Sequence, residues 1–364
     1  MKKCMALFLC ICLVLSLFGC SEEDTSKKEI TVLCCVEYVP DKVAQQFYEK
    51  TGVRVKIETA SDDDDVAQKI KNNPEKYDLV IASDYAMNEL RKLNLLQPLK
   101  KEKIKNFKNV NSIYRNYYYD PQNELTVPLN VSALVIVYNK KTCPIKIDGF
   151  EDLFNPALKN QISFLNNANA IISICNAVNN SDLNSMENLN GVETMLETLA
   201  QNTQSLSDST PQDAIISGDA SVGVMLNVSA GTALAKNKNC EMVYPKEGFM
   251  MLTDSIACCG FDEPNSSAFS FIDFLLTPDV ISGVIENING CPTVSAAIPK
   301  MSSAYATNKG YILNPNEMKN GKFFHKLLPG VQTDFDIIYF KVFRTHLEAI
   351  ETVPDEENSP GQET

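Results

Sequence analysis

The chain has 364 residues, a formal net charge of −13 and a hydrophobic content of 44%. This length allows two domains of roughly 100 to 200 residues each, and the apolar content is enough for a core in both. The acidic balance argues against nucleic acid and anionic lipid as partners, and it is compatible with a cationic ligand.

The N-terminus has the pattern of an export signal. Two lysines precede an apolar run that ends at Gly19-Cys20; the run has about 15 residues, and a membrane span needs about 20. The ending resembles a bacterial lipobox, in which the cysteine is acylated. We therefore predict a lipoprotein signal over 1–19, lipidation at Cys20 and a polar tether over 20–28. The alternative is an ordinary secretory signal whose cysteine falls there by chance.

Strand and helix patterns then alternate. The first third predicts strands over 30–36, 53–59 and 77–82, and helices that begin at Pro40, Asp63 and Tyr85. The second half predicts strands over 162–165, 222–226 and 242–244, and helices over 169–179, 188–202, 266–276 and 278–288. This alternation favours an α/β fold whose sheets are mostly parallel, with helices on both faces. An acidic tail with two prolines over 351–364 is expected to be disordered.

The cysteines argue against metal chemistry and against catalysis. Eight remain after the signal and Cys20, and four of them form adjacent pairs in apolar runs, where a disulfide between neighbours is strained. We interpret most of them as small buried hydrophobic residues. No C-x-x-C pair occurs, and the only histidines are His325 and His346, so no metal, no cofactor and no nucleophile–base pair is expected.

Candidate site residues follow the predicted strands. In open α/β sheets, ligands bind beyond the carboxyl ends of the strands. The segments found there are Glu37-Tyr38, Ser83-Asp84-Tyr85, Thr253-Asp254-Ser255 and Gly290-Cys291-Pro292-Thr293.

In their order and separation, these segments resemble the periplasmic polyamine-binding proteins of ABC transporters, the spermidine/putrescine type of solute-binding protein. The similarity extends in register over residues 29–330 and includes Tyr77-Asp78-Leu79-Val80 and the run 269–280. It implies a two-lobed clamshell that closes over its ligand by hinge motion. Lobe one would comprise 29–130 and 255–300, and lobe two would comprise 131–254 and 301–350. The chain would cross between the lobes near Pro128–Ala133, Asp254 and Ile298–Ser302.

The resemblance also implies site residues. Carboxylates and tyrosine hydroxyls would bind the ammonium groups, and aromatic rings would cover the methylenes. The positions that match the family in residue type are Glu37, Tyr38, Ser83, Tyr85 and Asp254. Asp254, which lies between the apolar residues Leu252 and Ile256, is the predicted anchor for an ammonium group. For Ser83 and Tyr85, the alternative is a helix-capping serine beside a core tyrosine.

Other cleft positions depart from the family. The chain has no tryptophan, and Cys35, Leu226 and Leu252 stand where the family often has one. Cys291 replaces a tyrosine and Phe324 a glutamine. Asn167 and Ala170 replace two acids that hold the far end of the ligand. The cleft could therefore hold a short diamine such as putrescine, or a molecule with one cationic end.

The sequence thus predicts an exported, lipid-anchored receptor, monomeric and without catalytic activity, that delivers a small cation to an ABC permease. One alternative keeps the receptor and changes the ligand to another organic cation, an amino-acid-like molecule or a metal chelate. A second is a surface lipoprotein that binds a partner through the same fold. An enzyme would need a general base beside a nucleophile, and the sequence shows no such pair.

Overall fold

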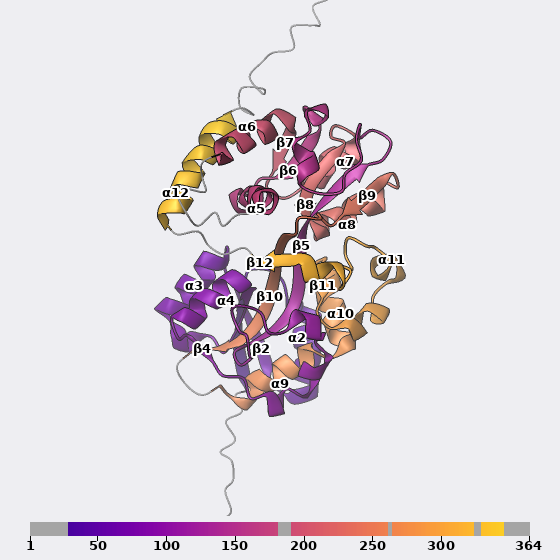
Figure 1. The fold of residues 1–364 in the computed structure, drawn as a ribbon. Coiled ribbons are helices and arrows are strands. Elements are labelled where there is room, and N and C mark those ends of the chain that lie inside the picture. Colours follow the sequence, from indigo (N-terminus) through magenta and orange to yellow (C-terminus); the bar gives the residue numbers. More distant parts are fainter. Residues whose placement is uncertain (1–27, 181–190, 261–263, 324–328, 346–364) are drawn as a thin grey trace, which may run out of the picture.

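The computed structural model describes residues 28–180, 191–260, 264–323 and 329–345. The predicted signal, Cys20 and the acidic tail lie outside these ranges, as does nearly all of the tether. Figure 1 shows two lobes that meet at the long strands β5 (Thr126–Asn139) and β10 (Phe249–Cys259). The two-lobed α/β fold is the one predicted.

The lower lobe in Figure 1 contains a mixed sheet in the order β2-β1-β3-β10. Strand β1 is parallel to β2 and β3, whereas β10 runs antiparallel to β3. The bounds of its strands are Glu29–Cys34 (β1), Arg54–Thr59 (β2), Leu79–Ser83 (β3) and Leu96–Gln97 (β4). Those of its helices are Asp41–Thr51 (α2), Asp63–Asn72 (α3), Asp84–Lys92 (α4), Ser266–Leu275 (α9) and Pro278–Asn287 (α10).

Local sequence explains where these helices begin and end. Helix α2 follows Pro40 and ends at Gly52, whose φ of 74° is the left-handed conformation that glycine adopts without strain. Helix α3 begins where the Asp62 carboxylate accepts a hydrogen bond from the Asp65 amide. The predicted beginnings of α2, α3 and α4 lie within one residue of those in the structure.

The upper lobe is arranged around the second half of β5. This half pairs antiparallel with β8 and β9, while β6 lies parallel to β7 and β8. The sheets are therefore mixed and not mostly parallel as predicted, because β5 and β10 run antiparallel to each other, β10 to β3 and β5 to β8. The bounds of its strands are Ile162–Leu165 (β6), Thr203–Ser207 (β7), Val222–Leu226 (β8) and Cys240–Val243 (β9). Those of its helices are Ala168–Asn179 (α5), Val192–Asn202 (α6), Gln212–Ser217 (α7), Asn227–Lys236 (α8) and Pro329–Ile338 (α12), which continues as a π-helix over Tyr339–Arg344.

Short elements complete the structure. They are the strands Cys291–Pro292 (β11) and Gly321–Phe323 (β12), the helix Ser303–Ala306 (α11), and 3-10 helices over Pro74–Lys76, Lys101–Lys103, Lys105–Asn109, Ser112–Tyr114, Glu151–Phe154, Pro156–Leu158, Ser295–Lys300 and Glu317–Asn320. Strand β11 pairs with β5 and β12 pairs with β10, so both lie at the junction of the lobes.

A close contact of two glycines marks a further passage between the lobes, after α11. A Cβ atom on Gly310 would lie 2.3 Å from the backbone nitrogen of Gly231 in α8. The side-chain amide of Asn308 donates to the Gly231 carbonyl at 2.8 Å, and that of Asn227 donates to the Gly310 carbonyl at 3.0 Å. This part of the chain therefore lies directly against the upper lobe.

Each lobe has its own apolar core. One cluster of buried residues surrounds the upper sheet, and two more cover the opposite faces of the lower sheet. Of the eight cysteines in the described ranges, six are buried, and all eight are unpaired. Most of these thiols therefore act as the small buried residues predicted. In the described residues, no single helix is long and apolar enough to cross a membrane.

Candidate functional site

The candidate site lies where strands of the lower lobe reach the junction. In the register of the sheet, Asp254 on β10 is opposite Ser83 on one side and Asn130 on the other. The β5–β10 register shifts between Asp254 and Ser255, where Pro128 interrupts the ladder because proline has no amide hydrogen. This irregularity places Asn130 directly beside the predicted anchor.

Asp254 is half-buried and held by two side chains. Its Oδ2 accepts hydrogen bonds from the Tyr38 hydroxyl at 2.5 Å and from the Asn130 amide at 2.9 Å. Burial raises the pKa of Asp254; the hydrogen bonds from Asn130 and Tyr38 oppose this, and the nearby charge of Asp63 raises it further. None of the ion pairs found among the described residues includes Asp254, so its charge is met by neutral donors alone.

Asn130 links two strands that end at the site. Its Oδ1 accepts a hydrogen bond from the backbone amide of Cys291 at 2.8 Å, while its amide group donates to Asp254. Gly290 makes room for this contact, because a Cβ atom there would lie 2.4 Å from Oδ1 of Asn130. The sequence prediction did not include Asn130 among the site residues, since nothing in its local pattern distinguishes it.

The structure gives Ser83 a capping role as well as a place at the site edge. Its hydroxyl accepts from the Ala86 amide at the start of α4 and donates to Asp63 at 2.5 Å. Tyr85 is half-buried, so it is not the core tyrosine of the alternative interpretation. Glu37 is exposed in the loop after β1, and its backbone carbonyl accepts from the Asn287 amide at 3.3 Å.

The altered positions lie on both sides of the junction. Cys35 is half-buried, and its pKa is raised to about 12, first by burial and then by the charge of Asp63. Leu252 is half-buried, and Cys291 is almost fully buried with its sulfur accepting from the Leu313 amide. Asn167 is exposed and caps α5 through the Ala170 amide. Phe324 and His325 lie outside the described residues.

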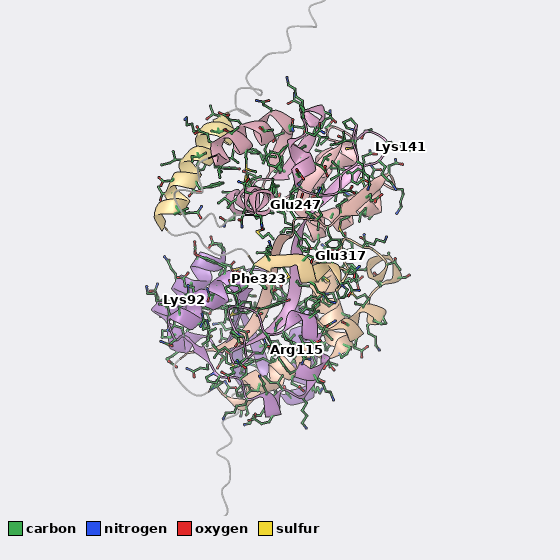
Figure 2. The ribbon with its side chains drawn as sticks, viewed as in Figure 1. Lys92, Arg115, Lys141, Glu247, Glu317 and Phe323 are labelled. Carbon is green, nitrogen blue, oxygen red and sulfur yellow. The ribbon has the colours of Figure 1, made fainter. Side chains whose placement is uncertain are left out.

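An aromatic cluster adjoins these residues. Figure 2 shows Phe323, from β12, at the junction of the lobes, below Glu247. Its ring lies 4.6 Å from that of Tyr117 and 5.2 Å from that of Tyr118, between ring centroids. All three rings are half-buried. The chain therefore has aromatic surface beside the acids although it contains no tryptophan.

Three acids near the junction act on one another. The pKa of Asp84 is raised by burial and by the charges of Asp254 and Asp63, and Asp63 also raises that of Asp254. Within the described residues, however, no group of three His, Cys, Asp or Glu side chains is arranged to hold a metal ion. Closely spaced acids without a basic partner suit an organic cation, whose charge can be spread along a chain of atoms.

Two α/β lobes joined by crossing strands, with polar side chains at the junction, define a periplasmic-type solute-binding fold. The family model for bacterial extracellular solute-binding proteins matches residues 74–311, and the chain belongs to this family. It is a binding protein that acts outside the cytoplasm, not an enzyme. The resemblance in the sequence is thereby confirmed at the level of the family.

The chain is also similar to binding proteins whose ligands are known by name. The chain is 30% identical to the spermidine/putrescine-binding periplasmic protein of Salmonella typhimurium over 279 residues, which cover 75% of this chain and 79% of that protein. It is 28% identical to the protein of the same name from Escherichia coli K12 over 295 residues, 79% of this chain and 84% of that protein.

Solved structures share the fold. The spermidine/putrescine ABC transporter substrate-binding protein PotD from Streptococcus pneumoniae superposes with a TM-score of 0.77 at 23% identity, over 88% of this chain and 99% of that one. The Tp0655 lipoprotein of Treponema pallidum gives a TM-score of 0.69 at 18% identity, again over 88% and 99%.

Proposed function

We propose that this protein captures a polyamine-like cation between its lobes and delivers it to an ABC permease. The observation that carries the proposal is the Asp254 carboxylate at the lobe junction, held by Tyr38 and Asn130 and without a basic partner among the described ion pairs. An ammonium group would supply the missing positive charge. The relatives named for spermidine and putrescine support this ligand class.

The bound ion would contact the acids and tyrosines of lobe one together with Asp254, the last residue of the lobe-two segment 131–254. In this proposal, Asp254 binds an ammonium group, Glu37, Tyr38, Ser83 and Tyr85 complete the polar end, and Cys35, Leu252 and Cys291 line the cleft. Asn167, on lobe two, is neutral and already caps a helix. A ligand with its charge concentrated toward lobe one, such as putrescine, therefore suits the site better than a long triamine.

The lobes would act as the two halves of a clamshell. Lobe one would comprise 29–130 and 255–300, and lobe two 131–254 and 301–350. Strands β5 and β10 support this division. One end of β10 pairs with β3 of the lower lobe, and the other end reaches the junction, while β5 pairs with β10 at one end and with β8 of the upper lobe at the other. The helix α11 and Gly310 would form a further hinge.

Export would end in attachment to a membrane. The Gly19-Cys20 ending supports lipidation at Cys20, with residues 20–28 as the tether. The lipid would hold the receptor, as a monomer, near the permease that receives its ligand. More than one acyl chain would be needed for stable attachment, since a single chain binds only reversibly.

Isothermal titration calorimetry of the purified mature protein with putrescine and with spermidine tests the proposal. We expect saturable binding of at least one of them, with putrescine preferred. Absence of heat with both, in protein whose native fold is verified by circular dichroism, would refute the polyamine assignment and leave the receptor class intact.

A further inference from the structure

Asp84 lies next to the site residue Ser83 in the sequence, but the proposed binding of the ligand gives it no role. It is the first residue of α4, follows β3 directly, and is 2% exposed. Its Oδ1 accepts from the Thr253 amide at 3.2 Å, and its Oδ2 accepts from the Tyr118 hydroxyl at 3.0 Å. None of the ion pairs in the described residues includes Asp84.

Two buried hydroxyls beside Asp84 are poorly satisfied. Thr253 is 1% exposed, and neither its hydroxyl nor that of Tyr117 makes a hydrogen bond of good geometry within the described residues. Burial raises the pKa of Tyr117, a side-chain interaction with the Thr253 hydroxyl lowers it and the charge of Asp84 raises it further, so these groups lie close together. Buried hydroxyls that have at most each other as poorly placed partners are costly, and their presence indicates a place where another group can bind.

The rings beside Asp84 are those of the aromatic cluster. Tyr118, which donates to Asp84, lies 5.2 Å from Phe323 and 5.4 Å from Tyr119 between ring centroids. Tyr119 in turn shares a hydrogen bond of 2.9 Å with the Ser255 hydroxyl on β10. An acid bordered by aromatic faces is the arrangement that attracts an ammonium group carried on methylenes.

We propose that Asp84 is a second carboxylate of the ligand site, which releases its proton to solvent when a cationic solute binds beside Asp254. This inference rests on the proposed function, since it assigns to the same site a further residue and a dependence on pH. Asp84 would thereby provide in lobe one a charge that lobe two lacks at Asn167. The bound cation would be matched by two acids, Asp84 in lobe one and Asp254 at the boundary where lobe two meets it.

The charges near Asp84 explain why it keeps its proton when no ligand is bound. The charges of Asp254 on β10 and of Asp63 on α3 act on Asp84, and it receives the Tyr118 hydrogen bond from the segment before β5. Burial raises the pKa of Tyr118, and Arg91, on the same helix as Asp84, lowers it. Burial, together with the two acids, raises the pKa of Asp84 to about 7, against the hydrogen bonds from Thr253 and Tyr118. A cation placed among these acids favours ionisation, so binding and proton release are linked.

A purely structural role for Asp84 leads to a different expectation. An acid in the first turn of a helix is stabilised as an anion by the helix dipole. If Asp84 served only α4, ligand binding would leave its protonation unchanged. Release of a proton from Asp84 on ligand binding therefore distinguishes a residue of the ligand site from one that only caps the start of a helix.

The test is calorimetry with putrescine from pH 6 to pH 8, in two buffers of different ionisation enthalpy. For an acid whose pKa falls from about 7 to about 5 or less on binding, the association constant rises roughly tenfold over this interval. We expect this rise in the wild type, with close to one proton released near pH 6. Asp84→Asn, which keeps the shape, should flatten the profile and remove most of the proton release.

Two further variants complete the experiment. Asp279→Asn is the matched control, because it removes one acid from an exposed ion pair with Lys300 in the same lobe; its pH profile should equal that of the wild type. Tyr118→Phe removes a donor to the ionised Asp84 and should move the rise to higher pH. If Asp84→Asn binds putrescine with the wild-type pH profile, the inference is wrong and the proposed function stands. If the wild type binds no polyamine, both fail together.

Discussion

The Tyr38 hydroxyl donates a hydrogen bond to Asp254 at 2.5 Å across a sequence separation of 216 residues. Tyr38 follows β1, whereas Asp254 lies within β10, and the two strands are separated in the sheet by β3. Burial raises the pKa of the Tyr38 hydroxyl well above its ordinary value, and the charge of Asp254 adds to this effect. The hydroxyl therefore stays protonated and keeps the carboxylate oriented for a ligand.

Replacing Asp254 by asparagine should abolish most of the affinity for putrescine. The substitution keeps the shape but removes the charge that an ammonium group needs. Loss of one partner from a buried charge pair typically costs about 3 to 5 kcal/mol, and about 1.4 kcal/mol corresponds to a tenfold change. We expect at least a hundredfold weaker binding by calorimetry. Glu37→Gln should cost less, because Glu37 is exposed and solvent screens its charge.

The control for this experiment is Asp279→Asn, which changes the net charge equally at an exposed ion pair. Its affinity for putrescine should remain within about twofold of the wild type, since exposed pairs contribute little. An Asp254→Asn protein that binds as tightly as this control would show that the ligand lies elsewhere.

Much of the fold could be predicted from the sequence, because the patterns that determine helices and strands are local. The predicted strands over 162–165 and 222–226 have the same bounds as β6 and β8. Periodicity and helix-end signals determine such elements without knowledge of distant contacts. Strand β5 was not predicted, since Pro128 interrupts a run whose partners lie in both lobes.

Only part of the candidate site could be inferred in the same way. The position of Asp254 between the apolar residues Leu252 and Ile256 drew attention to it, but its partner Asn130 depends on the shifted register between β5 and β10. Asp84 was visible as a polar residue after a strand, yet its burial depends on Tyr118 and Thr253, which come from distant segments. Contacts between distant segments require the assembled sheet, and a single sequence does not specify them.

The buried Asp84 should make stability depend on pH. Its pKa is about 7 in the folded protein, above its ordinary value of 3.8, so the folded state binds the extra proton. The contribution to stability is therefore present at low pH and is lost as the pH rises through about 7. Between pH 5 and 7 the free energy of unfolding should fall by about 1.4 kcal/mol per pH unit through this group. Urea unfolding of wild type and Asp84→Asn measures the difference.

The comparison with Asp84→Asn is needed because Asp254, whose pKa is also raised by burial, can add its own pH dependence. The wild-type curve minus the variant curve isolates the contribution of Asp84. A difference that does not change between pH 5 and pH 8 would contradict a raised pKa at this position.

Cys20→Ala should block lipidation. The thiol is the atom that would be acylated, so the variant should accumulate as an unprocessed precursor in cells. Mass spectrometry of the N-terminus and partitioning into detergent measure the outcome. Normal cleavage of the variant, with detergent partitioning equal to that of the wild type, would favour the ordinary secretory signal.

Ligand binding should bring the two lobes together. Because the proposed contacts come from both lobes, a bound solute favours the closed arrangement over the open one. Small-angle X-ray scattering should record a smaller radius of gyration at saturating putrescine than without ligand. Asp254→Asn at the same concentration is the matched control and should stay at the larger radius. An unchanged radius in the wild type, with binding verified by calorimetry, would argue against hinge closure.

Two glycines offer a matched test of the passage after α11. In Gly310→Ala the added Cβ would meet the backbone of Gly231 at 2.3 Å, and backbone atoms cannot move aside as a flexible side chain can. We expect a loss of about 1 to 3 kcal/mol in the free energy of unfolding, as for other overpacked sites. Weaker putrescine binding should accompany it, because the contact of Gly310 with α8 fixes where the chain enters the upper lobe.

Gly283→Ala is the control for Gly310→Ala: Gly283 lies within α10, and no atom stands within 4 Å of its added Cβ. There, alanine should stabilise the helix by about 0.5 to 1 kcal/mol. Urea unfolding should thus move in opposite directions for the two variants. Equal stability of Gly310→Ala and the wild type would mean that this passage is looser than the contact with Gly231 implies.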